Sequence, residues 1–166
     1  MVTAMDDKLP KRKHLRLKEY DYSQNGAYFI TICTKDRRCL FGPVGADSIS
    51  ARIVKRTFQE IIAQRPGIDS PVFVVMPNHF HAIITIERAD MESAPTISDV
   101  VQAFKRYSTV EYGKMVHKGL LPPYDKQVWQ RSFHDHIIRN QADYDDICRY
   151  IEENPLQWEQ DKLYCE

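Results

Sequence analysis

The stretch VFVVMPNHFHAIITI, residues 72–86, decides the fold of this chain. Both of its halves are rich in β-branched and aromatic residues, which favour strands. Between them, Pro77-Asn78 is a tight-turn signal. The stretch therefore predicts two antiparallel strands, residues 72–76 and His79–Ile86, joined by a short turn.

Further elements are expected on both sides of this hairpin. Residue patterns predict a strand at 28–34, a helix at 50–64, a helix at about 98–112, an extended segment at 128–139 and a helix at 143–153. Ser50 is the expected N-cap of the first helix, and Asn154-Pro155 is expected to end the last one. The order strand, helix, strand, strand, helix, strand, helix predicts an α/β (α+β) fold. It is the ferredoxin-like split β-α-β sandwich, with an antiparallel sheet and an additional C-terminal helix.

The 166 residues suggest one domain, residues 28–166, preceded by a basic arm, residues 1–27. The chain has 23 Lys and Arg against 23 Asp and Glu, a formal net charge of zero. Nucleic-acid binders are more often basic overall, but phosphates respond to local charge. Cations concentrate near the N-terminus at Lys8, Lys11, Arg12, Lys13, Arg16 and Lys18. This cluster is either a phosphate-binding patch or a solvated tail.

Cysteine spacing and hydropathy indicate a cytoplasmic protein. Cys33, Cys39, Cys148 and Cys165 form no C-x-x-C pair, so reduced thiols are expected. The first residues are polar and charged, unlike a signal peptide. The longest apolar runs are too short to span a bilayer, so no membrane association is expected.

His79-Phe80-His81 is the first candidate for chemistry. Side chains alternate across a strand, so the two histidines share one face while Phe80 points into the core. Their backbones would stand roughly 7 Å apart, close enough for both imidazoles to converge on one metal ion. Two ordinary strand histidines are the alternative. The second such motif, 134–136 (HDH), lacks an apolar anchor at its centre and is interpreted as polar lining or structure.

The last predicted helix carries Tyr150, with Asn154 one turn further on. A tyrosine hydroxyl can attack phosphorus and form a covalent intermediate when a nearby divalent ion polarises the phosphate. The Asn154 oxygen is a possible further ligand for a hard cation. Read from periodicity alone, Tyr150 packs and Asn154-Pro155 is a plain helix stop. On the preceding helix, residues 104–107 (FKRY) suit single-strand binding by charge and stacking, or form a solvated face.

Three ordered blocks of the sequence carry a resemblance. They are residues 76–81 (MPNHFH), 128–140 (VWQRSFHDHIIRN) and 150–155 (YIEENP), and residues 28–37 add a strand followed by basic residues. Together they resemble the HUH family of single-tyrosine transposases, in the branch of REP-associated tyrosine transposases. The resemblance covers most of residues 16–162.

This resemblance implies a ferredoxin-like fold, in agreement with the order of elements. It implies that His79 and His81 hold a Mg²⁺ or Mn²⁺ ion and that Tyr150 is the nucleophile, leaving a 5′-phosphotyrosine link and a free 3′-hydroxyl. Asn154 stands where related transposases place a polar third ligand, although Pro155 disfavours a helical backbone there. The implied substrate is single-stranded DNA with a small hairpin, bound by a monomer or a homodimer.

The basic residues expected to contact DNA are Lys11, Arg12, Lys13, Arg16, Lys105, Arg106 and Arg131. Tyr107 and Tyr112 remain rival nucleophiles. Two other functions also remain open. One is a nucleic-acid-binding module without turnover, and the other is a metal-dependent phosphoesterase in which water attacks and Tyr150 is structural.

Overall fold

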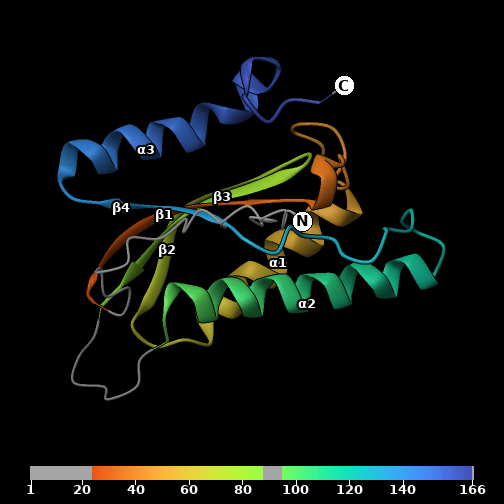
Figure 1. Ribbon diagram of the computed structural model, residues 1–166, viewed down its shortest axis with the longest axis horizontal. Coiled ribbons are helices and arrows are strands. Elements are labelled where there is room, and N and C mark those ends of the chain that lie inside the picture. Colours follow the sequence, from red (N-terminus) through yellow and green to blue (C-terminus); the bar gives the residue numbers. More distant parts are fainter. Residues whose placement is uncertain (1–23, 88–94, 166) are drawn as a thin grey trace, which may run out of the picture.

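The computed structural model describes residues 24–87 and 95–165 (Figure 1). The elements follow in the order β1 (Gly26–Cys33), α1 (Ile49–Ala63), β2 (Ile68–Met76), β3 (His79–Ile86), α2 (Ile97–His117), β4 (His134–Ile138) and α3 (Gln141–Glu153). Two 3₁₀ segments, η1 (Lys35–Arg37) and η2 (Asn154–Gln160), follow β1 and α3. The four strands form one antiparallel sheet in the order β2-β3-β1-β4. This arrangement confirms the predicted ferredoxin-like sandwich with an added C-terminal helix.

The two faces of the sheet have different covers. Helices α1 and α2 lie along one face, and α3 lies along the other (Figure 1). The core forms on the α1–α2 side, where Phe80 is fully buried. Its ring centroid lies 4.7 Å from that of Phe58 and 4.8 Å from that of Phe104. The prediction that Phe80 points away from the flanking histidines into the core is confirmed.

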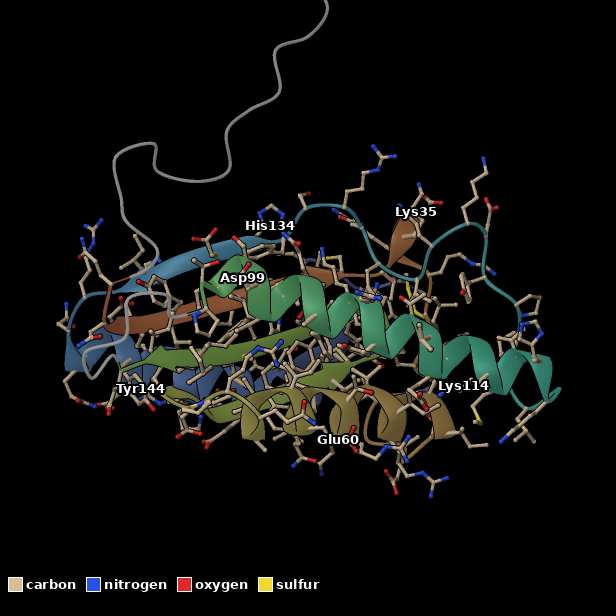
Figure 2. All side chains as sticks on the ribbon, turned by 90° about the horizontal axis from the view of Figure 1, so that it is seen from below. Lys35, Glu60, Asp99, Lys114, His134 and Tyr144 are labelled. Carbon is tan, nitrogen blue, oxygen red and sulfur yellow. A yellow bond between two sulfur atoms is a disulfide. The ribbon has the colours of Figure 1, made fainter. Side chains whose placement is uncertain are left out.

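Strand register determines which side chains meet on the α3 side. Thr31 of β1 pairs with His81 of β3 on one side and with His134 of β4 on the other. Cys33 pairs with His79. Because partners in an antiparallel pair share a face, His81, Thr31 and His134 form one row across three strands. In Figure 2, His134 lies on β4, at the margin of the sheet.

Several predicted boundaries are wrong by a few residues. Helix α1 is capped by Ser48, whose Oγ accepts from the Ala51 amide, and not by Ser50. Helix α2 continues past Tyr112 and ends at His117, with Lys118 as its C-cap. Gly119 follows with a φ of 71°, which suits the residue after a helix.

The predicted extended segment 128–139 is a strand only over its last part, β4. Residues 128–133 are not part of β4, although Trp129 forms an isolated antiparallel bridge with Thr34. Val128, Trp129 and Phe133 instead turn inward to join the core. The predicted basic arm, except for its last residues, lies outside the described residues.

The expectation of four reduced thiols is also wrong. Cys39 and Cys165 form a disulfide across a sequence separation of 126, while Cys33 and Cys148 are free. The pairing arises because the segment after η2 returns to the loop that follows β1. Sequence spacing alone carries no signal for such a return.

Candidate active site

The two histidines of β3 meet beneath the α3 layer. His79 and His81 are almost fully buried, and their ring centroids lie 4.5 Å apart. The predicted shared face is therefore present, and both rings turn toward one point. A third ring, that of Trp158 in η2, lies 5.8 Å from the ring of His79. The segment after α3 thus closes over the pair.

Asn78, in the turn before β3, fixes the orientation of His79. The Asn78 Oδ1 lies 2.8 Å from His79 Nδ1. Since an amide oxygen only accepts, His79 Nδ1 carries the proton and donates, which leaves the lone pair on Nε2. The amide nitrogen of Asn78 donates to the carbonyls of Leu163 at 2.7 Å and Arg37 at 3.2 Å. Sequence reasoning interpreted Asn78 only as a turn residue.

Asp161 is the functional candidate that sequence reasoning missed. Its Oδ2 lies 3.7 Å from His79 Nε2. With the proton on Nδ1, two lone-pair donors face each other there, an arrangement that a cation between them stabilises. Ligand atoms of His79, His81 and Asp161 all lie within 4.8 Å of one another. Among the described residues, this is the only such group of three or more His, Cys, Asp or Glu side chains.

Asn154 is part of the same cluster, although its role as a ligand is still a prediction. Its Nδ2 donates to Asp161 Oδ2 at 2.7 Å. Pro155 does not displace it from helical geometry, because Asn154 has φ −54° and ψ −41° and its N–H still bonds to the Tyr150 carbonyl. Pro155 lies in the first turn of η2, where its missing N–H is not needed.

Two buried atoms in this cluster fit the presence of a metal ion. Within the described part of the chain, His79 Nε2 and Asn154 Oδ1 are buried without a hydrogen-bond partner. Buried polar atoms without partners are costly and need a specific explanation. Imidazole nitrogens with carboxylate and amide oxygens form a donor set suited to a divalent ion such as Mn²⁺ or Mg²⁺.

Both imidazoles are neutral at pH 7. Burial lowers the pKa of His79 to about 4, against the opposing effect of the Asp161 carboxylate. Burial, followed by the neighbouring His79, lowers the pKa of His81 to about 3. Neutral imidazole is the form that binds metals.

Helix α3 carries Tyr150 to this cluster within a single chain. Its Oη lies 3.5 Å from His81 Nε2, and the ring centroids of the two residues are 5.4 Å apart. Tyr150 is 45% exposed, so its hydroxyl is accessible. Its pKa is raised, first by burial and then by the Asp161 carboxylate. The phenol therefore stays protonated until positive charge is added beside it.

The alternative nucleophiles and the second His-x-His motif lie outside this cluster. Tyr107 and Tyr112 are on α2, which covers the opposite face of the sheet, and the Tyr112 hydroxyl is engaged with the Pro122 carbonyl at 3.2 Å. His136 is exposed and pairs with Asp143 at 2.9 Å. The second His-x-His motif therefore does not join the cluster.

The predicted DNA-contacting residues are spread over the chain. Lys105 Nζ donates to three consecutive carbonyls, those of Gln130 (2.7 Å), Arg131 (3.2 Å) and Ser132 (2.9 Å). These bonds give Lys105 a structural role. Arg106 and Arg131 are exposed. Lys11, Arg12, Lys13 and Arg16 lie outside the described residues.

Comparison with known proteins agrees with the fold and the residue cluster. The family described as "Transposase IS200 like" matches residues 22–154, so the chain belongs to the IS200-like transposase family. It is 33% identical to an uncharacterized protein of Haemophilus influenzae, in a match that covers 99% of each chain. It is 26% identical to the REP-associated tyrosine transposase of Escherichia coli, over 82% of this chain and 70% of that relative.

A solved REP-associated tyrosine transposase bound to a REP hairpin has the same fold, with a TM-score of 0.60 and 23% identity. The match covers 86% of this chain and 74% of the other. The predicted transposase family is confirmed, and the chain is a tyrosine transposase. Its likeness to REP-associated members agrees with the predicted branch. No helix among the described residues is long and apolar enough to cross a membrane.

Proposed function

We propose that this transposase cleaves single-stranded DNA beside a hairpin by attack of the Tyr150 hydroxyl on a backbone phosphate. The proposal rests on one observation above all, the 3.5 Å distance between Tyr150 Oη and His81 Nε2 within one chain. The bond that forms joins Tyr150 Oη to phosphorus. The bond that breaks joins phosphorus to the 3′ oxygen, leaving a 5′-phosphotyrosine link and a free 3′-hydroxyl.

His79, His81 and Asp161 are proposed to hold a Mn²⁺ or Mg²⁺ ion, with Asn154 as a further oxygen donor. When bound, such an ion polarises the phosphate and favours the phenolate. The residues of the chain position the reacting groups. Asn78 orients the His79 ring so that its Nε2 lone pair faces Asp161, and α3 places the Tyr150 hydroxyl beside His81. Because all these groups come from one chain, cleavage by a monomer is the simplest arrangement.

The test uses a panel of end-labelled single strands that carry hairpins, incubated with Mn²⁺ or Mg²⁺. Denaturing electrophoresis should show a protein–DNA adduct with the parent protein. Tyr150→Phe removes only the hydroxyl, so cleavage and adduct should vanish together while folding and DNA binding persist. Tyr107→Phe is the matched control and should behave as the parent, because that residue lies on the other side of the sheet.

The alternatives give different results. A phosphoesterase in which water attacks gives free products and no adduct, and it remains active as Tyr150→Phe. A binding module without turnover gives a shifted band on a native gel and no cleavage under any metal condition. An adduct that persists in Tyr150→Phe contradicts the assignment of the nucleophile.

A further inference from the structure

A cavity of about 550 Å³ adjoins the tyrosine and the buried histidines. Phe29 and Thr31 of β1 line it together with His81 and Tyr150. The half-buried Phe29 ring lies 5.3 Å from the His81 ring and meets the Tyr150 ring edge-on at 6.0 Å. An aromatic surface therefore lies directly beside the hydroxyl that is proposed to attack DNA. Aromatic rings of this kind stack on unpaired bases.

Gln130 and His134 supply another part of the cavity lining, and the chain that carries them is held rigidly. The Gln130 N–H donates to the Cys33 carbonyl at 2.9 Å, which ties it to the end of β1. The Gln130 and Ser132 carbonyls both accept from Lys105 Nζ. His134 is fixed by its pairing with Thr31. Such a preformed wall gives up little conformational freedom when a ligand binds.

Two polar side chains of the cavity lining, those of Gln130 and His134, have no partner within the described residues. No hydrogen bond or ion pair there engages the Gln130 amide or the His134 ring, whereas His136, two positions along β4, is paired with Asp143. An amide offers a donor and an acceptor together, and an imidazole offers one of each when neutral. These are the groups that recognise the hydrogen-bonding edge of an unpaired base.

Two cations, Arg37 and Lys162, line the cavity as well, and both residues are exposed. Arg37 follows Asp36 in a turn where both residues have left-handed backbones, with φ of 55° and 54°. Left-handed conformations are unfavourable for residues other than glycine and concentrate at functional sites. Positive charge next to an aromatic surface is the usual combination for holding the backbone of a single strand.

We infer that this cavity is a binding site for the unpaired nucleotide next to the cleaved phosphate. Phe29 stacks on its base, Gln130 and His134 contact the base edge, and Arg37 and Lys162 bind its phosphate. Gln130 and His134 therefore determine which base is accepted beside the cleavage point. This inference rests on the proposed function, because it places the reacting phosphate at Tyr150.

The experiment measures coupling between a side chain and a base. A Tyr150→Phe protein, which binds without cutting, is used to select strands from a pool with twenty random nucleotides. Each position of the best strand is then replaced by an abasic nucleotide, and the dissociation constant is measured. Loss of the base in the cavity should weaken binding about tenfold, within the range for a stacked or hydrogen-bonded base.

The same measurements follow in Gln130→Ala and His134→Ala, with His136→Ala as the matched control. The abasic penalty at that one position should fall below about threefold in the first two proteins and remain about tenfold in the control. Full penalties in both cavity variants overturn the inference, as does an equal loss in the control. A pool without base preference overturns it too.

A failure of the base-binding inference can be distinguished from a failure of the proposed cleavage. The selected strand is also given to the protein that retains Tyr150, and the adduct and the cut position are mapped. Absence of an adduct contradicts the proposed cleavage, whereas coupling is read from binding alone. Coupling at a base remote from the mapped cut contradicts the inference and leaves the cleavage chemistry standing.

Discussion

Acidification should destabilise the metal-free protein well before its carboxylates are protonated. His79 and His81 have pKa values of about 4 and about 3 in the folded state, against about 6.5 when unfolded. Between these limits the unfolded chain binds protons that the folded chain excludes. The free energy of unfolding therefore rises with pH in this window. The contribution of the two neutral histidines to stability is lost as the pH falls below 6.5.

The size of the effect follows from the two shifts. At pH 5 each histidine is almost fully protonated in the unfolded chain and neutral in the folded one. Each then contributes a loss of about 2 kcal/mol, and the pair about 4 kcal/mol, relative to neutral pH. That is a large fraction of the total stability of a small domain. The urea midpoint should shift down by roughly 1–4 M.

Urea denaturation in the presence of EDTA, from pH 7.5 to pH 5, measures this loss. The double variant His79→Asn, His81→Asn should show a much flatter profile, and His81→Asn alone should remove about half of the slope. A parent protein that loses less than about 1 kcal/mol would refute the reasoning. So would an unchanged slope in the double variant, because other groups would then be responsible.

Three other changes have defined outcomes. Phe80→Asp places a carboxylate in the core and should cost at least several kcal/mol, enough to prevent folding, whereas Tyr107→Asp, at a residue 52% exposed, should leave the melting temperature within a few degrees. Lys105→Met should cost about 1–3 kcal/mol by removing three carbonyl contacts, measured by thermal denaturation beside Arg106→Met, and equal stability of the two would contradict the structural role of Lys105. Mn²⁺ at a hundred times its dissociation constant should stabilise the parent by about 2.7 kcal/mol. In calorimetry this appears as a higher melting temperature that Asp161→Ala diminishes, and the metal assignment fails if the ion shifts both proteins equally.

The sequence predicted strands best where a turn signal and strand-forming residues stand together. The bounds of β3 were predicted correctly, because Pro77-Asn78 marks the turn before it and the run from His79 to Ile86 is rich in apolar and β-branched residues. The end of α2 was predicted less well, because the helix continues through Gly113 to His117 and the left-handed Gly119 lies two residues beyond it. Residues 128–133 were wrongly predicted to belong to the strand. Apolar side chains that reach the core from irregular backbone have the same composition as strand residues.

The acidic group of the cluster illustrates a different limit. Asp161 lies beyond the last regular helix, in a stretch with no hydrophobic period. Its approach to His79 depends on how η2 turns the chain back, and on contacts such as the Asn154 amide on its carboxylate. Such proximity is a tertiary property, so only the three-dimensional arrangement reveals it. Tyr150 and His81, by contrast, were paired in advance through the resemblance.

Strand β3 also limits which changes of chain length the protein tolerates. Its odd-numbered histidines face Tyr150 while the even-numbered Phe80 fills the core, and both sets share one backbone. Inserting or deleting a single residue between positions 79 and 81 would exchange the two faces, exposing the phenylalanine and burying a histidine among apolar rings. Relatives that keep the chemistry should therefore align across this strand without gaps. For engineering, grafts and length changes belong in the connections, and β3 should be transferred whole.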